Sequence, residues 1–156
     1  VIIPRGGKNL VKRVQDFSTV PIIGHLEGIC HVYIDREADI KMAKRIVINS
    51  KMRNFNICGA AETLLLDKIS LKTHCEPILQ ELTNLGCKII GDNELKKFFR
   101  GKIISARFKD WDTEYLSPTI SVKIVDGVKG AILHINKHGT FHTDSIITNN
   151  SKNAQI

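Results

Sequence analysis

Apolar and polar positions alternate along this chain in blocks that favour strands and helices in turn. The run Cys30–Ile34 is rich in β-branched and aromatic residues, which is typical of a buried strand. From Arg36 to Lys51 the apolar residues recur at helical spacing, and acidic residues occupy the first turn, where they favour the helix dipole. A second helix is predicted over Ser70–Leu85, with Gly86 at the position favoured for a C-terminal cap.

The remaining elements are shorter and follow the same alternation. The other expected strands are Val1–Ile3, Val20–Ile23, Glu62–Leu66, Cys87–Ile90, Ile120–Val125 and Ser145–Thr148, and the other expected helices are Lys8–Asp16, Asn93–Phe99 and Val128–His138. We expect Val20–Ile23 to be buried, and the polar tail 149–156 to be frayed. Strands separated by helices of about 10 to 16 residues predict an α/β fold with an open twisted sheet packed between helices.

Length and composition exclude several classes of protein. The chain has 156 residues, which suits a single core, and its 42% apolar and 25% charged residues exclude a chain that is mainly disordered. No apolar run approaches the roughly 20 residues of a membrane-spanning helix. The first residues lack the pattern of a signal peptide. We therefore expect a cytoplasmic protein without a membrane partner.

The charge distribution and the cysteine spacing further restrict the kinds of partner and ligand that we expect. The net charge is +7, but the basic clusters lack the interleaved aromatic residues of a base-stacking surface, so no nucleic-acid partner is expected. Lys, Ile and Asn, whose codons are A/T-rich, are all abundant, so codon bias explains part of the positive charge. The four cysteines form no CxxC pair and no Cys-plus-His spacing of a zinc site, so reduced thiols and no metal are expected.

Two local patterns suggest chemistry. Cys58 lies where a polar loop meets a Gly-Ala-Ala segment, and small residues there let a substrate and backbone N–H groups approach the sulfur. The alternative is an inert buried thiol. The turn Gly6-Gly7-Lys8 precedes a helix and suits a phosphate, but it matches neither GxGxxG nor GxxxxGK, and a plain strand-to-helix turn explains it as well.

Longer motifs carry a family resemblance. The segments IIPRGGKNLVKRV, STVPIIGHLEGICHVYIDREADIKMAKRIVINSK, ICGAAETLLL, DWDTEYLSPTISVKIVDGVKGAILHINKHG and HTDSIIT together resemble the γ-glutamyl phosphate reductases, also called glutamate-5-semialdehyde dehydrogenases, of the aldehyde dehydrogenase superfamily. The resemblance covers essentially the whole chain. It implies an aldehyde dehydrogenase-like catalytic domain, NADPH as cofactor and γ-glutamyl phosphate as substrate, in the biosynthesis of proline.

The same resemblance assigns roles to residues. It places the catalytic cysteine at Cys58, which would form a thioacyl intermediate that hydride then reduces to the aldehyde. It matches Glu114 to the position that contacts the nicotinamide ribose, and His25 to the position where aldehyde-oxidising relatives keep a general-base Glu. The other candidates for lining the substrate pocket are Arg53, Gly59, His142 and Thr143.

Two departures from the family leave the activity open. Family members are well over twice as long, so the resemblance implies that residues 1–18 are the last strand–helix unit of a cofactor-binding domain and that 19–148 form the catalytic domain. Around Cys58 the family pattern KTQRPGVCN is replaced by KMRNFNICG, so that an arginine, a proline and the Asn after the cysteine are lost, and the neighbouring Arg53 is a candidate to compensate for the arginine. Either the chain is the catalytic portion of an enzyme, inactive alone and either cut from a longer chain or completed by a separately encoded cofactor domain, or it is a non-enzymatic binding module. Surface normally covered by a cofactor domain would also favour self-association.

Overall fold

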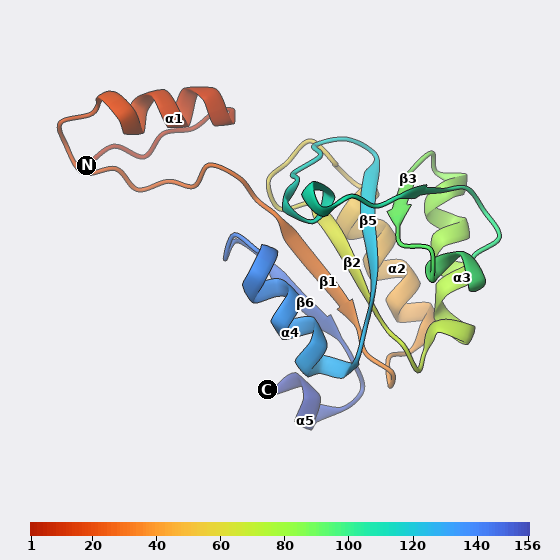
Figure 1. Ribbon diagram of the computed structural model, residues 1–156. Coiled ribbons are helices and arrows are strands. Elements are labelled where there is room, and N and C mark those ends of the chain that lie inside the picture. The colour runs from red at the N-terminus through yellow and green to blue at the C-terminus, as the bar shows by residue number, and fades with distance from the viewer.

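Six parallel strands form one open sheet in the computed structural model, which describes residues 1–156 (Figure 1). Along the sheet their order is β4-β3-β5-β2-β1-β6, and every neighbouring pair is parallel. The strands are β1 Cys30–Ile34, β2 Ala61–Asp67, β3 Lys88–Gly91, β4 Ile103–Ser105, β5 Thr119–Val125 and β6 Asp144–Ile147. The predicted α/β class is therefore confirmed.

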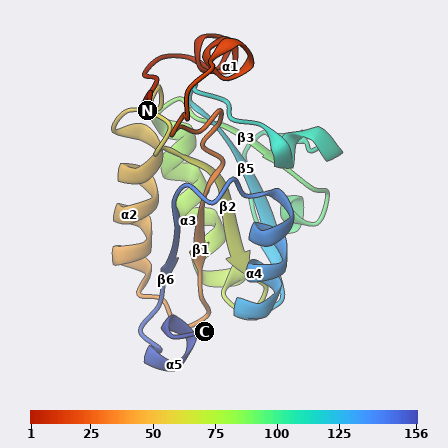
Figure 2. The same cartoon turned by 90° about the vertical axis from the view of Figure 1, so that its left-hand side faces the viewer.

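Helices cover both faces of this sheet. The helices α2 (Ile40–Met52) and α3 (Leu71–Asn84) pack on one face, and α4 (Gly127–His138) lies on the other, as Figure 2 shows with the sheet between α2 and α4. The remaining helical elements are α1 Lys8–Phe17, η1 Leu95–Lys97, η2 Phe108–Asp112 and α5 Ser151–Ala154. None of the helices combines the length and apolar character that crossing a bilayer requires.

The core is divided between the two faces by the alternation of strand residues. Val32 of β1 and Leu64 of β2 belong to the large cluster beneath α2 and α3. Tyr33 and Leu65, the next residue on each strand, belong to a small cluster beneath α4. All residues of β1 and β2 are buried, the polar His31, Glu62 and Asp67 included, because helices cover both faces of the sheet.

The boundaries differ from the predicted ones where local hydrogen bonds decide them. The helix expected from Arg36 begins at Ile40, because the Asp39 side chain accepts a hydrogen bond from the Met42 N–H at 2.8 Å and so caps it. The tail that was expected to fray ends in α5, where the Asn150 side chain caps the helix and Asn153 Nδ2 donates to Asp35 at 3.0 Å.

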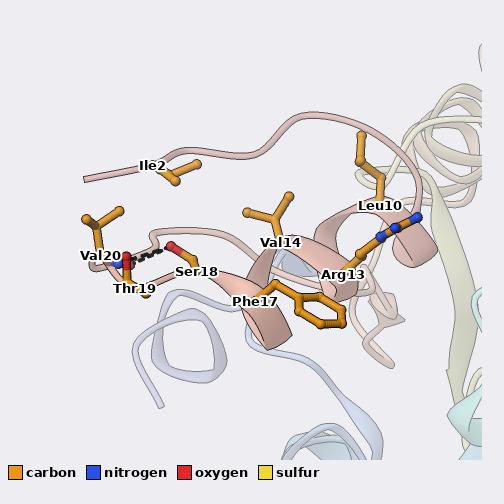
Figure 3. Close-up of a pocket in the computed structure, with 8 residues that line it drawn as sticks. All are labelled: Ile2, Leu10, Arg13, Val14, Phe17, Ser18, Thr19 and Val20. Atoms are coloured by element: carbon orange, nitrogen blue, oxygen red, sulfur yellow. Dashed lines mark hydrogen bonds between the residues drawn. The ribbon is translucent and has the colours of Figure 1, made fainter.

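The N-terminal segment corrects one prediction. Val20–Ile23 was expected to be a buried strand, but it forms only one parallel bridge, between Ile2 and Ile22, and Val20 is 45% exposed. It pairs with no strand of the main sheet, and α1 lies apart from that sheet (Figure 1). Apolar side chains of this segment, including Leu10, Val14 and Phe17, instead line an open pocket of about 580 Å³ (Figure 3).

A buried histidine cluster lies between the sheet and α4. The ring of His134 is 4.6 Å from that of His138, 5.4 Å from Trp111 and 5.5 Å from His31, measured between centroids, and its Nε2 has no hydrogen-bond partner. Burial lowers the pKa of His134 from 6.5 to about 3, and the neighbouring His138 adds to the effect. The fold therefore holds this imidazole neutral.

Acid is consequently expected to destabilise the fold through His134. Below pH 6.5 the unfolded chain takes up a proton at this residue, whereas the folded chain does not until about pH 3. The contribution of neutral His134 to the free energy of unfolding is thus fully present above pH 6.5. Between pH 6.5 and about 3 it falls with decreasing pH by about 1.4 kcal/mol per pH unit. Urea unfolding between neutral and mildly acidic pH measures this slope. His134→Leu should flatten it, and parallel profiles for both proteins would contradict the assignment.

Candidate active site

Four segments that precede adjacent strands meet at the amino-terminal edge of the sheet. Cys58 lies before β2, Gly28 before β1, Glu114 before β5 and His142 before β6. Because β5, β2, β1 and β6 are parallel neighbours, their leading loops must converge at one edge. The sheet topology therefore brings together residues that lie far apart in the sequence.

Cys58 faces a partly open pocket at this edge. Its side chain is exposed, and the pocket has a volume of about 320 Å³. The polar residues that line it come from the N-terminal turn, from the segment before β1 and from the loops before β2 and β5. The complete lining is Pro4, Arg5, Gly6, Gly7, Lys8, His25, Leu26, Asn56, Cys58, Glu114 and Leu116.

Close backbone contacts fix the position of the Cys58 loop. A Cβ atom on Gly28 would lie 2.1 Å from the Cys58 carbonyl oxygen, so only glycine permits this approach. The same carbonyl accepts a hydrogen bond from Cys30 Sγ at 3.1 Å. The N–H of Gly28 donates to Glu114 Oε1 at 2.9 Å, which ties the loop before β5 to the same point. These contacts tie the backbone at Cys58 to the segment before β1 and, through Gly28, to the loop before β5.

Two imidazoles flank the thiol. One ring nitrogen of His25, one of His142 and the Cys58 sulfur all lie within 4.8 Å of one another. The two rings are arranged edge to face with centroids 4.6 Å apart, and His142 Nδ1 lies 2.9 Å from Thr143 Oγ1. An imidazole beside a cysteine is the usual acceptor of the thiol proton in cysteine nucleophiles.

The other three cysteines are unsuited to this chemistry. Burial raises the pKa of Cys30 to about 11, that of Cys75 to about 12 and that of Cys87 to about 11. All three are buried, whereas Cys58 is exposed. Only Cys58 combines an open approach with neighbouring imidazoles.

A buried ion pair joins the two ends of the Cys58 loop. Lys51 Nζ, near the end of α2, lies 2.6 Å from Glu62 Oε2 in β2, and both side chains are fully buried. The other carboxylate oxygen of Glu62 accepts from the Leu116 N–H at 3.2 Å. Burial raises the pKa of Glu62, and the adjacent ammonium of Lys51 opposes that shift. Glu62 therefore ties both the end of α2, through Lys51, and the loop before β5, through Leu116, to β2.

The pocket contains several, but not all, of the residues expected from the sequence. Cys58, His25 and Glu114 line it, whereas His142 lies beside Cys58 and His25 without being part of the lining, and Thr143 contacts His142. Gly59 follows the thiol but does not line the pocket.

Arg53 was expected at the pocket and lies elsewhere. Its backbone still has helical angles at the end of α2, and it lines a separate groove between α2 and α3. The arginine that lines the pocket is Arg5. The sequence pattern did not single out Arg5 or Gly28, and the partner of Gly28 is distant in the chain.

Known proteins resemble this chain over nearly its whole length. No protein-family model matches the sequence. The chain is 49% identical over 154 residues to a γ-glutamyl phosphate reductase of Rhodopseudomonas palustris, a match that covers 99% of this chain and 36% of the relative. It thus spans about a third of the length of the curated relatives it matches.

Solved structures give the same result. The γ-glutamyl phosphate reductase of Thermotoga maritima superposes with a TM-score of 0.93 at 38% identity, covering 98% of this chain and 37% of that one. The NADP-dependent glyceraldehyde-3-phosphate dehydrogenase of Bacillus halodurans, solved with NADP, superposes with a TM-score of 0.76 at 11% identity, over 98% of this chain and 40% of that one, and so shares the fold.

The chain accordingly has the α/β fold found in aldehyde dehydrogenase-like enzymes. Within this class the chain belongs to the γ-glutamyl phosphate reductase family, of which it represents one part. The resemblance indicated by the sequence motifs is confirmed.

Proposed function

We propose that this chain is the thiol-bearing catalytic portion of a γ-glutamyl phosphate reductase and that Cys58 is its nucleophile. The observation that carries the proposal is the exposed Cys58 thiol between His25 and His142, at the edge of a pocket in a chain of this family. The alternative of a non-enzymatic binding module has no comparable feature in its favour.

The first chemical step uses only residues of this chain. A neighbouring imidazole accepts the proton of Cys58, and the sulfur attacks the acyl carbon of γ-glutamyl phosphate. The bond between that carbon and the phosphate oxygen breaks, phosphate leaves, and a thioester remains on Cys58. The negative charge on the carbonyl oxygen in this step needs N–H donors, for which the backbone N–H of Cys58 is the nearest candidate.

The pocket suits an anionic substrate. Arg5 and Lys8 line it, and Lys8 is the first residue of α1, whose unpaired N–H groups favour negative charge. Lys8 is also paired with Glu27, which leaves Arg5 as the unpaired cation for the substrate carboxylate or phosphate. A pocket of about 320 Å³ is large enough for a substrate of this size.

Glu114 fits the proposed contact with a nicotinamide cofactor. One of its oxygens accepts from the Gly28 N–H at 2.9 Å, which orients the carboxylate in the pocket and leaves the second oxygen for a ribose hydroxyl. NADPH, when bound, supplies the hydride that reduces the thioester. The role of this chain is to hold the acyl group on Cys58 within reach of that hydride.

We further propose that residues 1–18 belong to the cofactor-binding domain. In support, α1 stands apart from the sheet and carries exposed apolar side chains, with Leu10 52% and Phe17 79% exposed (Figure 3). An apolar face of this kind suits further packing, against the rest of a cofactor-binding domain or against a second copy of the chain.

We also propose that the reaction takes place in the cytoplasm. Four unpaired thiols are compatible with that reducing compartment.

Formation of a thioester on Cys58 tests the proposal. We expect the chain, supplied with γ-glutamyl phosphate generated in situ from glutamate and ATP by a separate kinase, to gain the mass of one γ-glutamyl group and to lose it with hydroxylamine. Phosphate-dependent reduction of NADP by glutamate 5-semialdehyde should follow once a cofactor-binding domain is present. Binding of glutamate without any adduct would instead favour the binding module.

A further inference from the structure

The structure places three metal-ligating side chains around one point at the mouth of the pocket. They are His25 before β1, Cys58 before β2 and His142 before β6, and one ligand atom of each lies within 4.8 Å of the other two. Sequence spacing gave no sign of this cluster, because its members come from three separate loops.

We propose that His25, Cys58 and His142 form a binding site for Zn²⁺. Two imidazole nitrogens and one thiolate are ligands that zinc prefers, whereas calcium and magnesium prefer oxygen. Three protein ligands leave the fourth tetrahedral position to water, as in zinc sites that remain open on one side. The open side here is the pocket that Cys58 faces.

The distances are compatible with such a site after small side-chain rotations. Zinc bonds of about 2.0 to 2.3 Å place tetrahedral ligands roughly 3.3 to 3.7 Å apart, so the present separations must shrink by no more than about 1.5 Å. His25 and Cys58 are exposed and His142 is half-buried, so the side chains have room to turn.

Contacts around His142 favour ligation. Its Nδ1 lies 2.9 Å from Thr143 Oγ1 and 3.6 Å from Cys30 Sγ. When Nδ1–H donates to the Thr143 hydroxyl, Nε2 is left unprotonated, which is the form that binds a metal. Hydrogen bonds of this kind orient histidine ligands in established zinc sites.

Zinc at this site would act as a reversible inhibitor, a consequence that rests on the function proposed for Cys58. A sulfur bound to zinc shares an electron pair with the metal, which lowers its nucleophilicity toward the acyl carbon. The same bond shields the sulfur from alkylation and oxidation. Removal of the metal by a chelator restores the thiol unchanged, since no covalent bond to carbon has formed.

Calorimetric titration of the full chain with zinc sulfate tests the site. We expect one zinc ion per chain, and an affinity at least about tenfold lower in His25→Ala and in His142→Ala, because each removes one of three protein ligands. Asn56→Ala is the matched control, since Asn56 lines the same pocket but offers no ligand to the cluster. No binding, or binding that both histidine substitutions leave unchanged, would overturn the proposal.

Two further readouts require no turnover. With Co²⁺ in place of zinc, we expect a thiolate-to-metal charge-transfer band that Cys58→Ser abolishes; its persistence in that variant would overturn the assignment of Cys58. Zinc should slow alkylation of Cys58, and a chelator should reverse this. Metal binding with these requirements but no thioester formation leaves the zinc site standing and removes the proposed function. Thioester formation without metal binding overturns the zinc site and leaves the proposed function standing.

Discussion

Replacing Glu62 by alanine should lower the free energy of unfolding by about 3 to 5 kcal/mol, the cost of removing one partner from a buried ion pair. Lys51 and Glu62 are both fully buried and 2.6 Å apart, so the substitution leaves the ammonium of Lys51 without water and without its counterion. The Leu116 N–H loses its acceptor at the same time. Urea unfolding of the two proteins measures the difference.

An exposed pair on the same side of the molecule provides the control. Lys44 and Glu81 lie 2.7 Å apart, but their side chains are 39% and 38% exposed. Glu81→Ala should therefore cost less than about 1 kcal/mol. A loss in Glu62→Ala no larger than in Glu81→Ala would show that burial of the first pair does not matter.

A double substitution separates the charge from the packing. Replacing Lys51 by methionine and Glu62 by leucine together removes both charges and retains most of the volume. Such replacements are often neutral or stabilising, so we expect the double variant to recover most of the stability that Glu62→Ala loses. The Cys58 loop lies between these two positions, and any loss of activity in a stable double variant would report the role of the pair in holding that loop.

The strands β1 and β2 and the helix α3 were predictable because each has a local sequence pattern of its own. β1 is rich in β-branched and aromatic residues, and β2 contains the apolar run Leu64–Leu66. The apolar face of α3 is followed by Gly86, whose φ of 85° needs glycine. β4 was missed because it is a short edge strand of three residues with little burial. Val20–Ile23 was wrongly expected to be buried, since an apolar run does not reveal whether a neighbouring layer is there to cover it.

The site was predictable only in part, for a related reason. Cys58 stood out through its small neighbours and its family motif, both of which are local. The meeting of His25 with His142 depends on the strand order β2-β1-β6, which the sequence pattern does not specify. The requirement for glycine at position 28 arises from the approach of the Cys58 carbonyl, a contact made in three dimensions. A reactive residue with a local motif can thus be found from the sequence, whereas its contacts with residues of other loops cannot.

Alkylation by iodoacetamide at neutral pH should modify Cys58 at least about a hundredfold faster than any other cysteine of the folded chain. A thiol whose pKa is raised from 9.0 to about 11, as at Cys30 and Cys87, has a thiolate fraction about a hundredfold below that of an ordinary exposed thiol. Cys75, with a pKa of about 12, should react more slowly still. Burial of these three adds a steric barrier that Cys58 lacks.

Cys58→Ala should remove the fast alkylation phase and, with it, all thioester formation, since no other thiol lies in the pocket. The matched control is Cys87→Ala, which removes a buried thiol outside the site and should leave both intact. Peptide mapping of the labelled protein identifies the residue, and in denaturant all four thiols should react at similar rates because the burial that separates them is gone. Equal rates in the folded chain, or a thioester that survives Cys58→Ala, would exclude Cys58 as the nucleophile and leave the pocket as a binding site only.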